Sequence, residues 1–106
     1  MKVLLDECLP KDLRDHLLGH DCESVPRVDF SGKANGELFR LAERAGWQIL
    51  LTMGQAMPYQ QNLADRTISP VIIHAQSNRL PDLLLRVPAV LAALRSIKRG
   101  QAVRIS

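Results

Sequence analysis

Short apolar runs that alternate with helix-like stretches are the feature that most constrains the fold of this chain. The clearest runs are apolar almost throughout, which is typical of strands buried on both faces of a parallel sheet. The stretches between them begin near Pro or Asn and most end at Gly, as helices commonly do. We expect strands at 3–5, 20–25, 47–52, 68–74 and 102–105. We expect helices at 10–19, 35–46, 57–63 (or a turn there) and 81–94, the last kinked or split at Pro88.

This alternation predicts an α/β protein: a three-layer α/β/α sandwich with a mostly parallel central sheet. With 106 residues, the chain is expected to form a single domain spanning 1–106. Ligands of such sheets bind beyond the carboxyl ends of the strands. Residues that directly follow the strands are therefore the first candidates for a functional site.

Composition narrows the functional classes. The apolar share of 46% excludes a disordered chain, and aromatic residues at 4% argue against a stacking platform for single-stranded nucleic acid. The net charge of +3 is unevenly spread: residues 1–69 carry −2 and residues 70–106 carry +5. An acidic front and a basic back suit a protein that binds a metal ion and phosphate groups, although a solvated basic face explains the charge equally well.

The same features give expectations about location. No apolar run approaches the roughly 18 residues of a membrane span, so we expect no membrane association. A strand-like run follows Met1 almost at once, which does not fit a signal peptide. The two cysteines, Cys8 and Cys22, do not amount to a disulfide framework. We therefore expect a protein of a reducing bacterial or archaeal cytoplasm.

Three carboxylates are the candidates for chemistry. Asp6 and Glu7 follow the first strand, and Glu37 lies in the first turn of the second helix. Asp6 is poorly placed to be the N-cap residue of the helix that follows. Pro10 favours the first turn of that helix, which places the N-cap near Leu9. Carboxylate oxygens are the ligands that Mg²⁺ and Mn²⁺ prefer, so this edge is a candidate site for either ion.

The sequence lacks the residue patterns of several other kinds of site. The three histidines are scattered and neither cysteine has the spacing of a zinc ligand. No glycine-rich phosphate loop and no serine nucleophile elbow is present. A phosphoacceptor domain needs an aspartate after the third strand, where this chain has Thr52-Met53-Gly54.

Several segments, taken in order, resemble a family of bacterial PIN-like domains. The resemblance covers nearly the whole chain, and it is carried by the order of motifs that are individually weak. These segments are MKVLLDECLP at 1–10, GKANGEL at 32–38, Leu51-Thr52, PYQQNL at 58–63 and SNRLPDLL at 77–84.

The resemblance implies a compact PIN-type sandwich and a toxin of a toxin–antitoxin pair. Such proteins are expected to be Mg²⁺- or Mn²⁺-dependent ribonucleases, with RNA and a cognate antitoxin as partners. By position, Asp6 matches the first metal-binding acid and Glu37 the helix-borne acid, while Glu7 adjoins them; these three are the expected catalytic and metal-binding residues. Phosphate contacts are then expected from Lys33, Asn78 and Arg79.

One departure from the family pattern affects the activity. The family usually places an aspartate after the Leu51-Thr52 strand end, where this chain has Gly54, and some members have a second acid where it has Ala56. This predicts a weakened or lost metal site. Two alternatives stay open: a non-catalytic PIN-like module that binds RNA or protein, and an α/β interaction protein whose acids serve structure. The apolar stripe at 87–94 would supply a homodimer or antitoxin interface if part of it is exposed.

Overall fold

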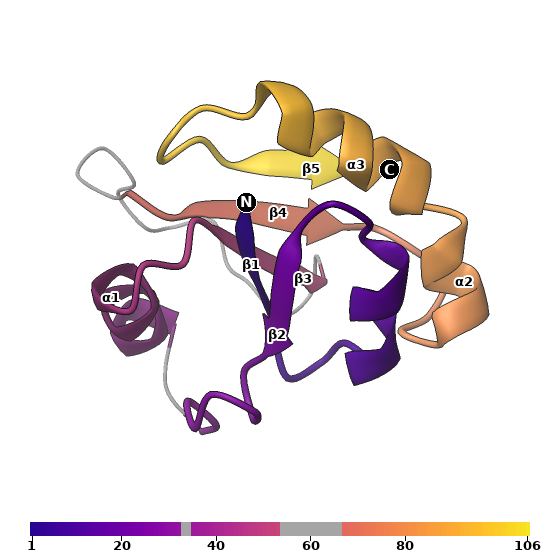
Figure 1. The fold of residues 1–106 in the computed structure, drawn as a ribbon. Helices are drawn as coiled ribbons and strands as arrows, with labels where there is room; N and C mark the ends of the chain where they lie inside the picture. Colours follow the sequence, from indigo (N-terminus) through magenta and orange to yellow (C-terminus); the bar gives the residue numbers. More distant parts are fainter. Residues whose placement is uncertain (33–34, 54–66) are drawn as a thin grey trace.

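A computed structural model describes residues 1–32, 35–53 and 67–106 of the chain. Five strands form one sheet: β1 (Lys2–Leu5), β2 (Asp21–Ser24), β3 (Ile49–Met53), β4 (Ser69–Ile73) and β5 (Val103–Ile105). The helical elements are the 3₁₀ helix η1 (Lys11–His16), α1 (Asn35–Arg44), α2 (Leu80–Leu84) and α3 (Val87–Ser96). Their arrangement is shown in Figure 1.

All four strand pairings are parallel, and the strand order is β2-β1-β3-β4-β5. The chain leaves β1 toward one edge of the sheet, returns past β1 to β3, and then adds strands toward the other edge. The direction of winding therefore reverses between β1 and β3. In open parallel sheets this reversal leaves a crevice at the carboxyl ends of the two strands, where ligands bind.

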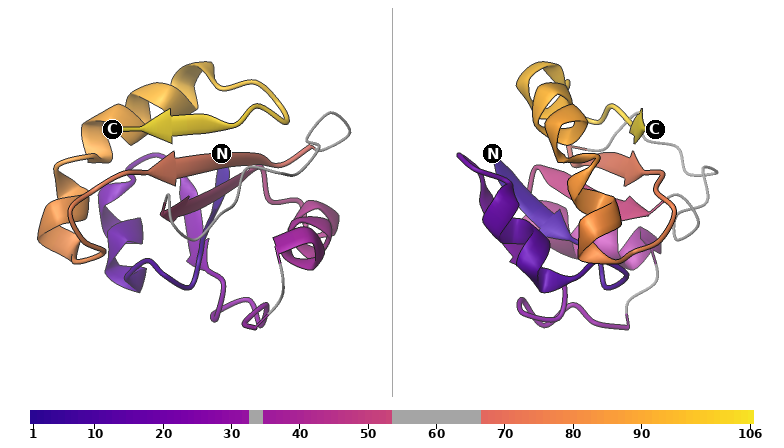
Figure 2. Two further views of the ribbon diagram at one scale, coloured as in Figure 1. Left: turned by 180° about the vertical axis from the view of Figure 1, so that it is seen from behind. Right: turned by 90° about the vertical axis from the view of Figure 1, so that its right-hand side faces the viewer.

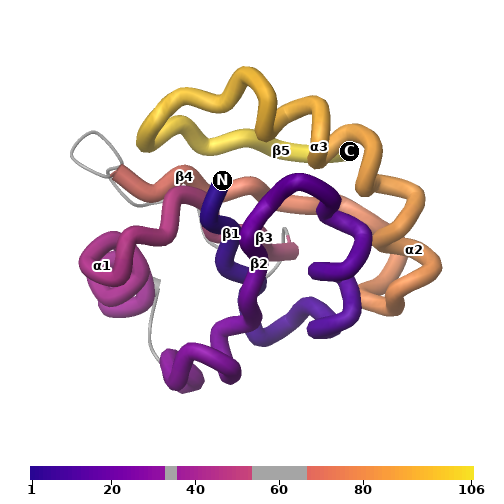
Figure 3. Tube along the Cα trace, in the orientation of Figure 1, coloured from indigo at the N-terminus to yellow at the C-terminus, as the bar shows by residue number. Residues whose placement is uncertain are grey.

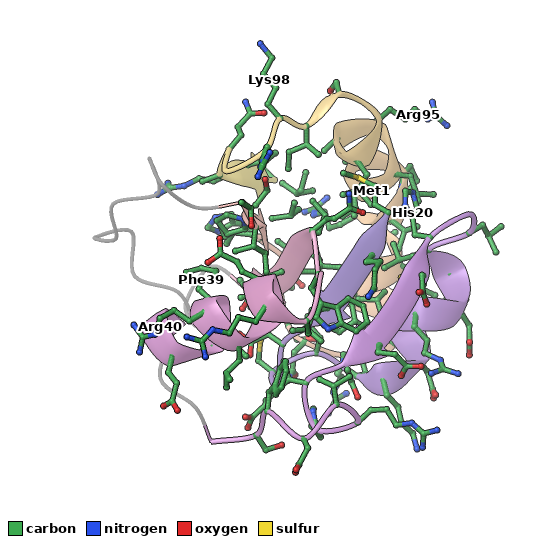
Figure 4. The ribbon with its side chains drawn as sticks, turned by 60° about the vertical axis from the view of Figure 1, so that its left-hand side comes forward. Met1, His20, Phe39, Arg40, Arg95 and Lys98 are labelled. Carbon is green, nitrogen blue, oxygen red and sulfur yellow. The ribbon has the colours of Figure 1, made fainter. Side chains whose placement is uncertain are left out.

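Helical elements cover both faces of the sheet, which confirms the predicted α/β sandwich. Leu38 and Phe39 of α1 pack against Leu4 and Leu50 on one face. The elements η1, α2 and α3 pack on the other face, over the side chains of β1, β3 and β4 that point the opposite way. Figure 2 shows α3 lying along β5, and Figure 4 shows Arg40 of α1 directed away from the sheet. The central strands are buried on both sides, which explains why they were recognisable as apolar runs.

The first predicted helix is wrong in type and extent. Instead of an α-helix over 10–19, the chain forms a 3₁₀ helix that ends at His16, where Leu17 leaves helical geometry with φ −96° and ψ 66°. Leu13 and Leu17 are buried as expected, but Leu18 is 77% exposed. Because the helix stops before it, Leu18 does not continue the buried face.

The remaining elements follow the prediction closely. The predicted split of the last helix is confirmed: α2 and α3 are separate, and Pro88 lies in the first turn of α3, where its missing N–H costs nothing. Pro70 is tolerated inside β4 because Ser69 N–H already bonds to Gln48 O on the β3 side. The nitrogen of Pro70 thus faces the β5 side, where pairing begins only at Val71. The short helix or turn predicted at 57–63 lies outside the described residues.

The chain ends lie at different ends of the sheet. The tube in Figure 3 shows the N-terminus at the start of β1, in the middle of the sheet. The C-terminus follows β5 and lies beside the first turn of α3. The Met1 ammonium lies 3.2 Å from Nδ1 of His20, and Figure 4 shows the two residues side by side. Among the described residues, no helix is long and apolar enough to cross a membrane.

Both cysteines are free, and they differ in accessibility. Cys22 is 8% exposed in β2, and burial, followed by the neighbouring Asp21 charge, raises the pKa of its thiol to about 11. Only the thiolate reacts with alkylating reagents. We predict that at pH 8 iodoacetamide modifies Cys22 at least about 100-fold more slowly than a model thiol of pKa 9.

Mass spectrometry of the Cys8→Ser variant, which keeps Cys22 alone, provides the measurement. The same protein unfolded in urea is the control, and there Cys22 should react at the model rate. A folded protein whose Cys22 reacts as fast as the unfolded chain would contradict the buried environment.

Candidate functional site

Asp6 lies at the reversal point of the sheet. It directly follows β1, and its N–H donates to Leu51 O of β3 at 2.9 Å, so its backbone is fixed by the sheet. One carboxylate oxygen, Oδ2, accepts a 2.6 Å hydrogen bond from the hydroxyl of Thr52. The other, Oδ1, accepts the N–H of Glu7 at 2.8 Å. Both carboxylate oxygens of Asp6 are thus held in place by hydrogen bonds.

Thr52 is a partner of Asp6 to which the sequence analysis assigned no role. It belongs to β3 and is fully buried, so its hydroxyl needs a partner inside the protein, and Asp6 supplies it. Sγ of Cys8 lies 3.6 Å from the same hydroxyl. A single polar side chain at the end of an otherwise apolar run was the available signal.

Glu7 has a different environment from Asp6. Its side chain is exposed, and Oε1 accepts a 2.6 Å hydrogen bond from the backbone N–H of Gly32. Gly32 belongs to the segment between β2 and α1. The carboxylate of Glu7 therefore links two segments 25 positions apart in the sequence.

Glu37 lies in the first turn of α1, on the face of the sheet that α1 covers, and its side chain is exposed. Asp29, in the segment after β2, is also exposed. Within ranges 1–32, 35–53 and 67–106, no three His, Cys, Asp or Glu side chains gather closely enough to hold a metal ion. Asp6, Glu7 and Glu37 are all among the residues searched, so they do not form a three-carboxylate cluster in this structure.

Asn78 and Arg79, the expected phosphate contacts, lie just before α2. Nδ2 of Asn78 donates to the carbonyl of Cys8 at 3.0 Å, which fixes this segment beside the one that carries Asp6. Arg79 is exposed at the start of α2. Lys33 and Gly54, as well as Ala56, lie outside the described residues.

The basic residues of the C-terminal part do not gather at one place. Arg79 belongs to the carboxyl edge of the sheet, whereas Lys98 and Arg99 border an open hollow of about 510 Å³ that also involves Met1 and Gln48, at the amino ends of β1 and β3. Figure 4 shows Arg95 and Lys98 pointing away from the body of the protein. The +5 charge of residues 70–106 is therefore divided between two ends of the sheet.

The oxygen atoms at the carboxyl ends of β1 and β3 are of the kind that bind a hard cation through few protein ligands. Asp6 offers a carboxylate at a rigid position, and the hydroxyl of Thr52 lies beside it. Mg²⁺ is usually bound through one or two carboxylates and completes its shell with water and substrate phosphate. The described residues suit that kind of site and do not suit one enclosed by protein ligands.

Comparison with protein-family models, with curated proteins and with solved structures finds no match for this chain.

Proposed function

We propose that this chain is a PIN-like domain of the toxin type: a Mg²⁺- or Mn²⁺-dependent ribonuclease with a weak metal site. The observation that carries the proposal is the placement of Asp6. Its carboxylate directly follows β1, where the winding of the sheet reverses, and it is held by the hydroxyl of Thr52 and by the N–H of Glu7. The resemblance of the N-terminal segment and the 32–38 segment to PIN-like domains supports the same function.

The residues of the site have separate roles in this proposal. Asp6 holds the ion, with Glu37 as the second, adjustable carboxylate. When bound, the ion supplies a hydroxide nucleophile and neutralises charge on the scissile phosphodiester. Arg79 and Asn78 contact phosphates of the RNA and set its register without reading its sequence.

Cleavage of a mixed RNA pool with Mg²⁺ or Mn²⁺ tests the proposal, with Asp6→Asn as the blank. We expect slow cleavage by the parent that is abolished by chelator and by Asp6→Asn. Cleavage that survives in Asp6→Asn would assign it to a contaminant. Absence of cleavage in the parent at high protein concentration would favour the second candidate below.

The second candidate is a non-catalytic PIN-like module that binds RNA. It is favoured by the engagement of Glu7 with Gly32, and by the finding that Asp6, Glu7 and Glu37 form no three-carboxylate group. RNA binding in the presence of chelator distinguishes this module from an α/β interaction protein, which would not bind RNA.

The large apolar side chains of the stripe at 87–94 pack toward the core. Val90 and Leu94 are buried, and Val87 and Leu91 are partly buried against the same core. The proposed protein partner is a cognate antitoxin, which rests on the resemblance alone, and the proposed setting of the pair is the bacterial cytoplasm.

RNA binding by either candidate should depend on Arg79 and on salt. The guanidinium is exposed at the carboxyl edge, and each phosphate contact releases counterions from the RNA. We predict that Arg79→Ala weakens binding of unrelated RNA sequences alike and lowers the slope of log affinity against log salt by about 0.7. Fluorescence anisotropy between 50 and about 200 mM salt measures both quantities.

The control for Arg79 is Arg95→Ala, which removes the same charge from the exposed surface of α3. An equal loss in both variants would mean that overall charge, rather than the carboxyl edge, determines binding.

A further inference from the structure

We infer that Glu7 is a positioning residue that fastens the β2–α1 segment to the end of β1, and that it is not a metal ligand. The inference deepens the proposed function, because it assigns one of the three expected acids a different task. Its basis is the 2.6 Å hydrogen bond from Gly32 N–H to Oε1 of Glu7. A carboxylate that accepts a backbone N–H at this distance makes a short, charge-assisted bond.

In the described part of this segment, up to Gly32, the other backbone anchors lie near its beginning. The N–H groups of Val28 and Phe30 donate to Ser24 O and Val25 O, and both side chains pack against the core under α1. Beyond Phe30, Ser31 and Gly32 are exposed. Within the described residues, the bond to Glu7 is the contact that holds this last part.

Gly32 is suited to being held in this way. Its φ is +78°, a conformation that residues with a side chain rarely adopt, and a Cβ built there would meet nothing within 4 Å. The glycine is therefore required by the backbone conformation and not by crowding. This conformation presents the N–H of Gly32 to Glu7.

The geometry separates Glu7 from its neighbour. Asp6 is bonded to β3 through Leu51 and Thr52, whereas Glu7 is bonded to Gly32 in the segment that follows β2. The two consecutive carboxylates and Glu37 do not converge into a group of three. Asp6 is therefore tied to the carboxyl ends of β1 and β3, and Glu7 to the segment that follows β2.

This attachment has a consequence for the proposed metal site. Glu37 follows Gly32 by five positions and lies in the first turn of α1. By holding Gly32, Glu7 restricts where α1 begins and so where the carboxylate of Glu37 lies. Loss of the bond should therefore weaken ion binding indirectly, through Glu37.

The substitutions Glu7→Gln and Glu7→Ala separate positioning from ligation. Glutamine keeps an oxygen that accepts the Gly32 N–H but loses the negative charge that a hard cation requires. Alanine loses both. If Glu7 positions Gly32, glutamine should restore what alanine loses, because it keeps the acceptor oxygen. If Glu7 binds the ion, glutamine should not restore the affinity.

Two measurements give the result. The first is exchange of the Gly32 amide hydrogen, followed by NMR in chelator, which needs neither metal nor RNA. We expect Glu7→Ala to accelerate it at least roughly tenfold, as for loss of one hydrogen bond to a charged group, and Glu7→Gln, which keeps an uncharged acceptor, to accelerate it clearly less. The second is Mn²⁺ affinity by calorimetry, where alanine should weaken binding and glutamine should leave it nearly unchanged.

The variant Glu37→Gln is the control, because it removes a carboxylate of the proposed site and leaves the Glu7–Gly32 bond intact. It should lower Mn²⁺ affinity without changing exchange at Gly32. Unchanged Gly32 exchange in Glu7→Ala, or a loss of Mn²⁺ affinity in Glu7→Gln as large as in Glu7→Ala, would overturn the inference. If the parent itself binds no Mn²⁺, the proposed metal site fails, and the exchange measurement alone still decides the role of Glu7.

Discussion

Replacing Asp6 by asparagine should lower the affinity of the protein for Mn²⁺ by at least about tenfold, or ~1.4 kcal/mol, without unfolding it. The charge that attracts the ion is lost, while the local hydrogen bonds can be kept. The asparagine oxygen can accept the N–H of Glu7, as Oδ1 of Asp6 does. Its amide nitrogen can donate to the hydroxyl of Thr52, which accepts as well as donates.

Calorimetry with Mn²⁺ on the parent and the variant gives the result, and Asp82→Asn is the matched control. Asp82 also accepts a 2.6 Å hydrogen bond from a hydroxyl, that of Ser77, so the two substitutions make the same chemical change. Only Asp6→Asn should reduce the affinity. Parental affinity in both variants would show that Asp6, at the end of β1, is not part of a metal site.

The fold was largely predictable because parallel strands are buried on both faces and therefore appear as apolar runs. In β4, all five residues are buried, and the run around them was recognisable despite Pro70. The end of α1 was recognisable from Gly46, whose φ of +87° is the left-handed conformation common after a helix. The first helix was misjudged because apolar spacing does not distinguish a short 3₁₀ turn from an α-helix, and Leu18 became exposed as a result.

The candidate site was predictable in position but not in its contacts. The rule that ligands bind at strand ends directed attention to Asp6, and the structure places it directly after β1, bonded to β3. The bond from Thr52 to Asp6 joins residues 46 positions apart, and the bond from Gly32 to Glu7 joins residues 25 apart. Local sequence patterns carry no signal for such pairs. The strand order, which brings β1 beside β3, was likewise not contained in the alternation of strands and helices.

The substitution Gly54→Asp should raise the affinity for Mn²⁺ and increase metal-dependent RNA cleavage. Gly54 lies outside the described residues, and the prediction rests on its place directly after Met53, the last residue of β3. A residue there follows β3, which pairs with β1, as Asp6 follows β1. Glycine contributes neither oxygen nor charge, whereas an aspartate would add a second carboxylate at a strand end and match the pattern of the PIN-like family.

A second carboxylate matters because a hard cation is held through its charged oxygen ligands, and Asp6 now supplies only one from the strand ends. We expect at least about a tenfold gain in affinity, with a larger gain in cleavage rate, since the ion supplies both the nucleophile and charge neutralisation. Calorimetry and cleavage of a mixed RNA pool measure the two effects, with Gly54→Asn as the uncharged control and Asp6→Asn as the blank. A folded Gly54→Asp protein that binds Mn²⁺ no better than Gly54→Asn would remove this position from the site. A parent that already cleaves RNA rapidly, with Asp6 essential, would show that the acids present are sufficient without it.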